Sequence, residues 1–498
     1  MKGPQKLLLT CLLWFPLIIQ AQTSIRVQEA REDIDWLQKS LEYIHPRLYK
    51  YTEKEKLDSL FQAARTEIAS SDKEILALDL LSIISKLNAE VNCGHLYTIP
   101  QYELKEEILQ KKVMPLYLKV IGKNLYVLDD CSKSDENLSG AKILSINERK
   151  SSEILQLMKA GIATDGYIES RKNRLIERYM NHSFHGFDLY FHLQVDRTEE
   201  FRIQYQLPGE KEILRMDLQG IGMDERKQLL KELYGKDERA WQNTPSPTFE
   251  LQKEEDYAIL RLPRSFYNKD LDPDFDTFLK TAFQELKSKE IKHLILDLRN
   301  NEGGSEHHQM ELMSYLYDKP FKLYQNIYLS HLDFRPLKEI IIERDPKDLL
   351  FNNDDQYMRK ISSDLWINNY KYGRSLNLQP PKKNTFEGKL YVLINGITFS
   401  SAADLAADIR KTTEATFIGE ESGGTFEGPT GGNTIVVQLP HSKIMIRISP
   451  NIHIGYLYRK HPIGRGVLPD HEVEYTIEDY LQGKDLELEK ALELIRKE

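Results

Sequence analysis

The chain has 498 residues, 40% of them hydrophobic and 29% charged. That is too long for one hydrophobic core, so we expect two or three domains. It carries 68 Lys and Arg residues against 77 Asp and Glu residues, a formal net charge of −9. This balance argues against a nucleic acid or an anionic membrane surface as the partner.

The N-terminus has the pattern of a secretory signal peptide. Lys2 and Lys6 precede an apolar run from Leu7 to Ile19, which is short for a membrane span, and Ala21 is a suitable last residue before cleavage. We therefore predict a signal peptide over residues 1–22 and an exported protein, in the periplasm, the cell envelope or outside the cell. No integral membrane span is expected after cleavage, and an uncleaved anchor is the alternative.

Two cysteines, Cys93 and Cys131, follow this segment. Export permits a disulfide between them, and two free thiols are the alternative. Two cysteines are too few to form the framework of a disulfide-rich domain.

The first region after the signal peptide, residues 23–101, is predicted to be a helical domain. Apolar residues recur at helical spacing in three segments, namely residues 34–44, 57–64 and 75–87. The loop NCGHLYTI, residues 92–99, follows the third helix.

The second region, residues 102–222, is predicted to be rich in β-strands. Strands are expected over 116–121 and 124–128, and a hairpin over 201–218 turns at Pro208-Gly209. Residues 139–158 predict a turn, a strand, a second turn and a helix. A charged linker over 223–247 follows, helical in its first part.

The third region, residues 248–498, alternates strands with helices and predicts an α/β domain. An amphipathic helix is expected over 275–286 and a terminal helix from residue 485. A long insertion over 317–386 is expected to form a lid or a wall. The strands are expected over residues 257–262, 293–298, 390–394 and 416–420, with a hairpin over 434–450.

Two serines, Ser400 and Ser401, lie where the strand over 390–394 passes through a small-residue turn into a helix. A serine on such a turn exposes its hydroxyl, and the first amides of the helix can stabilise negative charge. These features predict a nucleophile for acyl transfer. The alternative is that either serine merely caps the helix.

A second motif, LILDLRNNEGG, ends the strand over 293–298 in a loop with Gly303 and Gly304. Glycines let backbone amides approach a ligand closely. We predict an oxyanion hole made by the amide of Gly303 or Gly304 together with that of Ala402; a tight structural turn is the alternative. Asp297 and Arg299 are expected to fix this loop through hydrogen bonds.

The two motifs, in this order, resemble the core of the tail-specific, or carboxy-terminal processing, serine peptidases. LILDLRNNEGG is similar to their Asp-Leu/Val-Arg-x-Asn-x-Gly-Gly segment, and YVLINGITFSSAADLAADI to their strand–serine–helix segment. SGAKILSINERKSSEIL is similar to part of their PDZ-like domain. The resemblance implies a multidomain α/β fold: a helical N-terminal domain, a PDZ-like domain over 102–222, and a ClpP/crotonase-like peptidase core over 248–498. It also implies a polypeptide substrate and no cofactor.

The resemblance also bears on the nucleophile and its base. Aligning Asp404 with a glutamate of the family places the nucleophile at Ser401. The lysine that the processing peptidases use is missing from the loop GGTFEGPTGG, and Lys411 lies about 15 Å along the helix from Ser401. The tricorn-like branch of the superfamily uses a histidine from the helical region, and His95 lies in that place. We therefore predict His95 as the general base; a buried structural histidine is the alternative.

The sequence leaves the identity of the third catalytic residue open. No carboxylate aligns with the glutamate that the tricorn-like branch has before its RGVLPD-like segment. Asp470, Glu427 and Glu420 are the candidates to orient His95. His307 and His308 lack further ligands at suitable spacing, so no metal site is predicted.

These observations predict an exported serine-type peptidase with Ser401 as nucleophile and His95 as general base. The alternative is a catalytically silent peptide-binding protein on the same fold, because the lysine, the aligned glutamate and a second serine at Gly94 are all absent. The PDZ-like region is predicted either to bind a substrate's carboxy-terminus by strand addition or to serve as a structural insert.

Overall fold

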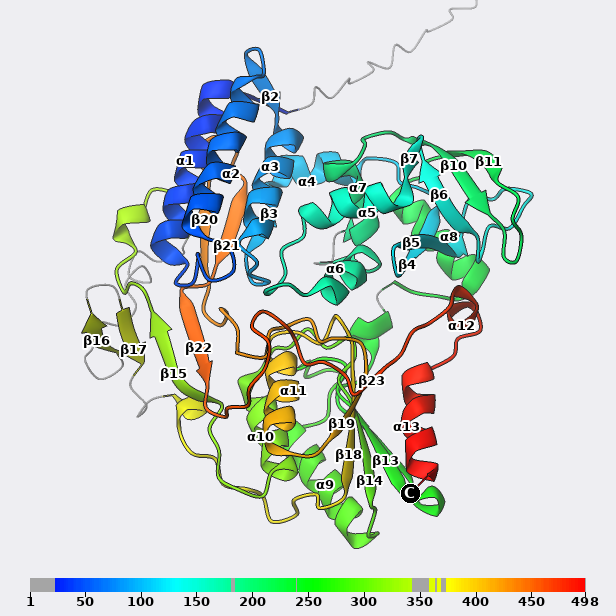
Figure 1. Ribbon diagram of the computed structural model, residues 1–498, viewed down its shortest axis with the longest axis vertical. Helices are drawn as coiled ribbons and strands as arrows, with labels where there is room; N and C mark the ends of the chain where they lie inside the picture. The colour runs from blue at the N-terminus through cyan, green and yellow to red at the C-terminus, as the bar shows by residue number, and fades with distance from the viewer. Residues whose placement is uncertain are drawn as a thin grey trace, which may run out of the picture.

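The computed structural model describes residues 23–180, 184–238, 240–342, 358–362, 365–368 and 373–497. The predicted signal peptide over 1–22 lies outside the described residues. Within those ranges, no helix has the length and apolar character needed to cross a membrane. A helical part and a β-rich part lie side by side at one end of the molecule, and an α/β part forms the other end (Figure 1).

The N-terminal part is helical, as predicted, and it shares its core with a hairpin from far along the chain. Its apolar core contains residues of the helices and also Val437 and Ile446 of that hairpin. We expected the hairpin to belong to the α/β part, but its apolar face is buried against the helices instead (Figure 1). The elements are α1 (Val27–Ile44), α2 (Lys54–Ala69), α3 (Ala77–Glu90), α4 (Tyr102–Leu109), the pair β1 (Ser24–Arg26) and β2 (Glu74–Leu76), and the sheet β20 (Ile435–Gln438), β21 (Met445–Ile448) and β3 (Tyr97–Ile99).

The β-rich part contains an antiparallel sheet in the order β11-β10-β6-β5-β4, with β7 beside β6. The predicted hairpin over 201–218 is present as β10 and β11, and the predicted strands over 116–121 and 124–128 as β4 and β5. The strands are β4 (Leu116–Ile121), β5 (Asn124–Asp130), β6 (Lys142–Ile146), β7 (Arg149–Lys150), β10 (Glu200–Gln206) and β11 (Leu214–Gln219). The remaining elements are α5 (Ser151–Ala160), α6 (Glu169–Ile176), α7 (Gly186–Gln194), α8 (Met223–Tyr234) and the short pair β8 (Tyr179–Met180) and β9 (Phe184–His185).

A buried ion pair joins α7 to α8 in this part. The side chains of Arg226 and Asp188 are only 2% and 1% exposed, and Arg226 donates to both carboxylate oxygens. Asp188→Ala would leave the guanidinium buried without its counter-charge, so we expect the free energy of unfolding to fall by about 3–5 kcal/mol. Urea denaturation measures this. The matched control is Asp217→Ala, because the side chains of Arg202 and Asp217, which form an ion pair, are 62% and 68% exposed. This substitution should lower the free energy of unfolding by less than about 1 kcal/mol. Equal losses would contradict the prediction.

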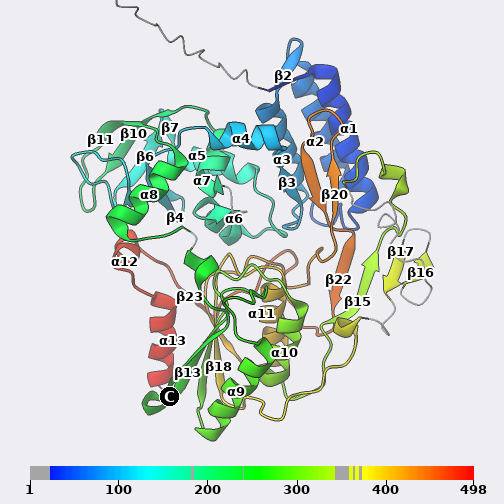
Figure 2. The ribbon, with the colours of Figure 1, turned by 180° about the vertical axis from the view of Figure 1, so that it is seen from behind.

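The α/β part is built on a six-stranded sheet in the order β12-β13-β14-β18-β19-β23, parallel except for β12. Alternate strand residues point to opposite faces, so Leu294 and Leu296 pack towards α9, α10 and α11, whereas Ile295 packs towards α13 (Figures 1 and 2). The strands are β12 (Thr248–Gln252), β13 (Tyr257–Arg261), β14 (His293–Asp297), β18 (Lys389–Ile394), β19 (Thr416–Gly419) and β23 (His471–Glu472). The helices are α9 (Phe275–Ser288), α10 (Glu306–Leu316), α11 (Ser401–Thr412), α12 (Ile477–Leu481) and α13 (Leu486–Arg496).

The long insertion over 317–386 contributes strands to a second sheet, in the order β16-β17-β15-β22. This sheet stands beside the core rather than within it (Figure 1), which agrees with a wall. Its strands are β15 (Tyr324–Leu329), β16 (Met358–Ser362), β17 (Leu365–Asn368) and β22 (Asn451–Gly455).

Both Cys93 and Cys131 are buried free thiols. Cys93 belongs to the core of the helical part, and Cys131 packs with Leu229 and Leu230 of α8. The structure therefore matches the two-thiol alternative.

Candidate active site

The loops that follow β14 and β18 meet at one edge of the central sheet. The two strands are parallel neighbours, so their carboxyl ends lie together, where α/β proteins commonly bind ligands. The amide of Phe399 donates to the carbonyl of Asn301 at 2.9 Å. The amide of Asn300 donates to the side chain of Asn395 at 3.0 Å, and the side-chain amide of Asn395 donates back to Asn300 at 3.0 Å. The serine turn and the Gly-Gly loop are therefore fixed relative to each other.

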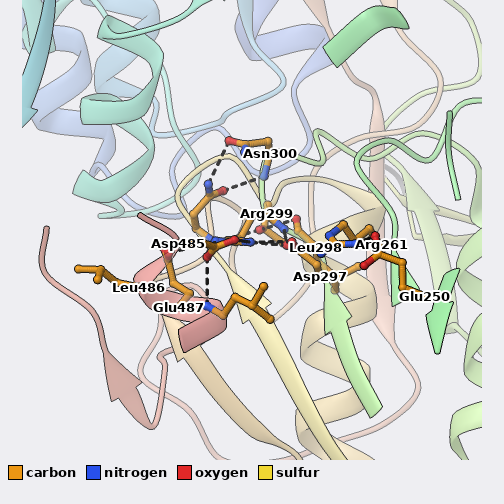
Figure 3. A network of polar contacts seen from close by, with 12 residues as sticks. Glu250, Arg261, Asp297, Leu298, Arg299, Asn300, Asp485, Leu486 and Glu487 are labelled. Atoms are coloured by element: carbon orange, nitrogen blue, oxygen red, sulfur yellow. Dashed lines mark hydrogen bonds and ion pairs between the residues drawn. The ribbon is translucent and has the colours of Figure 1, made fainter. Parts of the chain in front are cut away.

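Arg299 anchors the Gly-Gly loop, as predicted. Its guanidinium donates to both oxygens of Asp297 at 2.9 and 2.7 Å, to Asp485 at 2.7 and 2.9 Å, and to Glu487 at 3.0 Å. Figure 3 shows these groups converging just below Asn300. Although burial opposes it, this ring of carboxylates raises the pKa of Arg299. The network therefore ties the start of the loop to the start of α13.

Ser400 has an unusual backbone conformation, with φ 53° and ψ −130°. A non-glycine residue at positive φ is uncommon and marks local strain, which tends to concentrate at functional sites. A serine on a strained turn between a strand and a helix presents its hydroxyl to the outside, as in nucleophile elbows. Ser400 is partly exposed, whereas Ser401, the first residue of α11, is only 5% exposed.

His95 reaches this turn from the helical part of the molecule. Its Nε2 lies 3.1 Å from Oγ of Ser400, within hydrogen-bond distance. The loop that carries it is placed by the pairing of β3 with β21, and its ring stacks on Phe399 with centroids 4.6 Å apart. Segments that are some 300 residues apart in the chain thus form one serine–histidine pair.

The pairing differs from the sequence prediction, which placed the nucleophile at Ser401. Oγ of Ser401 is buried and has no hydrogen-bond partner among the described residues. The positive φ of Ser400 turns the chain so that its side chain, and not the next one, faces His95. The alignment on Asp404 could not detect this, because the conformation of the backbone turn decides which of the two neighbouring serines faces His95.

The imidazole of His95 is held neutral. Burial, together with the nearby charges of Arg171, Arg447 and His453, lowers its pKa to about 3. Its Nδ1 has no hydrogen-bond partner among the described residues. A neutral ring can accept a proton, but no carboxylate of the described residues contacts it to stabilise the imidazolium that would form.

The three carboxylates considered for that role are engaged elsewhere. In each case the hydrogen bonds brace a loop and leave His95 untouched, so the structure brings none of them to the imidazole. Glu420 accepts from the amide of Gly396, Glu427 from Lys50, Tyr51 and the amide of Gly464, and Asp470 from Arg410 and the amide of Phe417.

The Gly-Gly loop lies directly against the serine turn. A Cβ on Gly303, whose φ is +87°, would stand 2.7–2.8 Å from Phe399 O, Ser400 Cβ and Ser401 N. The backbone amides at this turn, which are the three predicted donors and that of Ser401, divide into two kinds. The amide of Gly303 already donates to Asn301 Oδ1 at 2.8 Å, and that of Ala402 to Phe399 O at 3.1 Å. The amides of Gly304 and Ser401 have no acceptor among the described residues.

Residues 256–473, which contain the serine turn and the Gly-Gly loop, match the model of Peptidase family S41. This part of the chain belongs to peptidase family S41. The family is that of the tail-specific serine peptidases, and the chain is a serine-type peptidase by this membership. No curated protein sequence matches it at a significant level.

Solved structures show the same fold over nearly the whole chain. Mature CPAF has a TM-score of 0.60 at 15% identity and covers 95% of this chain and 97% of its own. CPAF complexed with lactacystin has a TM-score of 0.60 at 14% identity and covers 95% of this chain and 99% of its own. At such identities the likeness concerns the fold, and the parts outside residues 256–473 share it.

Lys411 of the S41 domain has a structural partner. Its ammonium donates to Asp408 at 3.3 Å, and both side chains are buried. Burial raises the pKa of Asp408, and Lys411 opposes that rise. The pair is consistent with a structural lysine within α11, as the sequence indicated.

A cavity of about 190 Å³ adjoins the serine–histidine pair. Three of its lining residues, Gly94, Glu302 and Phe399, come directly before His95, Gly303 and Ser400 in the chain. Its wall mixes apolar side chains with polar and charged ones, among them Arg171, Arg178 and Glu302. The apolar lining includes Leu81, Leu96, Leu175, Leu189, Leu193 and Tyr190.

Both ring nitrogens of His307, close after the Gly-Gly loop, have protein partners. Asp276, His307 and Glu311 place one ligand atom each within 4.8 Å. His307 bonds Asp276 at 2.6 Å through Nε2 and accepts from Arg374 at 2.7 Å through Nδ1, while Lys382 pairs with Glu311. These cations take the place that a metal would need, so the cluster fits an ion-pair network.

The outer strand β4 of the β-rich part is partly covered. The amide of Val120 donates to Glu177 at 2.6 Å, and its carbonyl accepts from Arg174 at 3.3 Å. A peptide adding to this edge would have to displace both side chains. The arrangement favours the structural-insert alternative for this region.

Proposed function

We propose that the S41 domain is the catalytic part of an exported peptidase in which Ser400 is the nucleophile and His95 the general base. The observation that carries this is the 3.1 Å contact between Ser400 Oγ and His95 Nε2. Ser400 takes the role first given to Ser401, because only Ser400 combines exposure, a strained turn and a base within reach.

The proposed reaction has two half-steps. His95 accepts the hydroxyl proton at Nε2 while Ser400 Oγ bonds to the peptide carbonyl carbon; the imidazolium then protonates the leaving amine as the C–N bond breaks. Water repeats the sequence on the acyl-enzyme and releases the new carboxyl group. Since the resting imidazole is held neutral by burial, it starts each half-step in the form that accepts a proton.

The oxyanion would be held by the two unengaged amides, those of Gly304 and Ser401. The second lies at the N-terminus of α11, where the helix dipole adds positive potential. We propose this pair in place of Gly303 and Ala402, whose amides already have acceptors. Gly303 then serves to bring the loop against Ser400.

The remaining parts would serve the same active site. The proposed division is a helical domain over 23–101, a PDZ-like domain over 102–222, a linker over 223–247 and the peptidase core over 248–498, with the β20–β21 hairpin added to the helical domain's core. The substrate would be a polypeptide, and the cavity beside Gly94 and Phe399 would take one of its side chains.

A fluorophosphonate probe tests the proposal on the purified full chain. We expect a covalent adduct, and peptide mapping by mass spectrometry should place it on Ser400. The matched comparison is Ser401 in the same peptide. An adduct on Ser401 would overturn the assignment, and a chain that forms no adduct and cleaves no peptide would favour the silent peptide-binding alternative.

A further inference from the structure

The loop that carries His95 is held by a carboxylate from another part of the chain. Oδ1 of Asp165 accepts a hydrogen bond from the amide of Gly94 at 2.6 Å. The next residue, Gly166, donates its amide to the carbonyl of Asn92 at 3.0 Å. Together these bonds fix both sides of Cys93, so the path of the loop into His95 depends on the short segment between α5 and α6.

This segment is itself firmly seated. The amide of Tyr167 donates to the carbonyl of Gly464 at 2.8 Å. A Cβ on Gly166, whose φ is +55°, would come within 2.4 Å of that same carbonyl oxygen. The carboxylate of Asp165 is therefore presented to the His95 loop by backbone that has little freedom to move.

Asp165 lies among charged and titratable groups although it is only 4% exposed. Its Oδ2 has no hydrogen-bond partner among the described residues. Burial raises its pKa to about 6, while the bond from Gly94 and the charges of Arg171 and Lys50 work in the opposite direction. The groups that face it are Arg47, Lys50, Tyr51, Cys93, Tyr97, Arg171 and Glu427.

On the basis of the proposed function, we infer that Asp165 is a positioning residue for the general base, acting on His95 through the amide of Gly94. Serine–histidine sites usually place a carboxylate on the imidazole itself; here Nδ1 of His95 has no such partner among the residues that the structure describes. A hydrogen bond to a carboxylate is stronger than one to a neutral acid. Protonation of Asp165 would therefore loosen the loop and weaken the contact between His95 and Ser400.

The pH dependence of probe labelling separates Asp165 from His95. Labelling of the wild type should fall as the pH drops through about 6, where Asp165 takes up its proton. His95 is already neutral there, because its pKa is about 3. Asp165→Asn keeps an acceptor oxygen but cannot titrate. At neutral pH the labelling rate of this variant should stay within about threefold of the wild type. Its pH profile should lack the acid limb, which is the fall in labelling rate as the pH drops through about 6.

Two further variants complete the test. Asp165→Ala removes the acceptor and should slow labelling by about 10- to 100-fold. Glu427→Gln is the matched control from the same cluster: the charge of Glu427 raises the pKa of Asp165, so its removal should keep the acid limb and move it to lower pH. Melting curves of each variant check folding.

The outcomes are distinct. An acid limb that persists unchanged in Asp165→Asn, or wild-type labelling rates in Asp165→Ala, would overturn the role of Asp165 while the adduct on Ser400 still supports the proposed function. Should Asp165→Ala fail to fold, the profiles of the wild type and of Asp165→Asn decide. A wild type that forms no adduct at any pH would remove both proposals together.

Discussion

Ser400→Ala should abolish probe labelling and lower the rate of peptide hydrolysis by about 10⁴-fold or more, since removing a serine nucleophile removes the covalent route. The structure supports this choice because Ser400 Oγ is the hydroxyl that His95 contacts, at 3.1 Å. The variant should fold normally. Ser400 has φ 53°, a strain that the wild-type serine already bears through its own Cβ, and its side chain makes no other hydrogen bond among the described residues.

Ser401→Ala is the matched control, one residue along the same helix. Its Oγ is buried and has no hydrogen-bond partner in the described ranges, so losing the hydroxyl should leave labelling within about threefold of the wild type and stability unchanged or slightly higher. The amide proposed for the oxyanion is retained in this variant. Loss of labelling in Ser401→Ala with retention in Ser400→Ala would restore the register that the sequence alone indicated. The two variants can be measured with one probe and one peptide substrate.

The sequence predicted much of the α/β part because its signals are local. Buried apolar runs such as residues 293–298 and 390–394 became neighbouring parallel strands, and the motifs after them meet at the same sheet edge. The resemblance indicated that His95 lies near the serine turn, and its Nε2 is within hydrogen-bond distance of Ser400 Oγ. Periodicity and short motifs are sufficient for features that depend on neighbouring residues.

Features that depend on the backbone turn or on long-range packing were missed. The choice between Ser400 and Ser401 rests on a positive φ that either serine could have adopted. The β20–β21 hairpin has the same apolar alternation as a strand of the core, and only its contacts assign it to the helical part. Asp165 lies in no recognisable motif, because an Asp-Gly pair predicts only a turn. Its hydrogen bond with Gly94 joins residues that are 71 positions apart in the chain, which no local pattern indicates.

His95→Ala should lower probe labelling and peptide hydrolysis by about 10²- to 10⁴-fold, the usual contribution of a general base. The ring is 7% exposed and stacks on Phe399, so its removal leaves a space beside Ser400 that free imidazole can enter. Added imidazole should therefore restore part of the activity, and the restored part should grow with the fraction of neutral imidazole. The control is Lys411→Met: this lysine pairs with Asp408, so its loss should reduce stability while labelling of the folded fraction persists.

This comparison decides between the two kinds of base found in the superfamily. A lysine base would make Lys411→Met the inactive variant and leave His95→Ala active, which would contradict the proposed mechanism. With a histidine base, the rate is set by how well the site stabilises an imidazolium that burial disfavours and that no carboxylate contacts within the part of the chain that the structure describes. We therefore expect wild-type turnover to be slow compared with peptidases that place an aspartate on the imidazole. A substitution that brings a carboxylate to Nδ1 of His95 should then raise the rate, and the raised pKa of the imidazole would appear as a second acid limb in the pH profile.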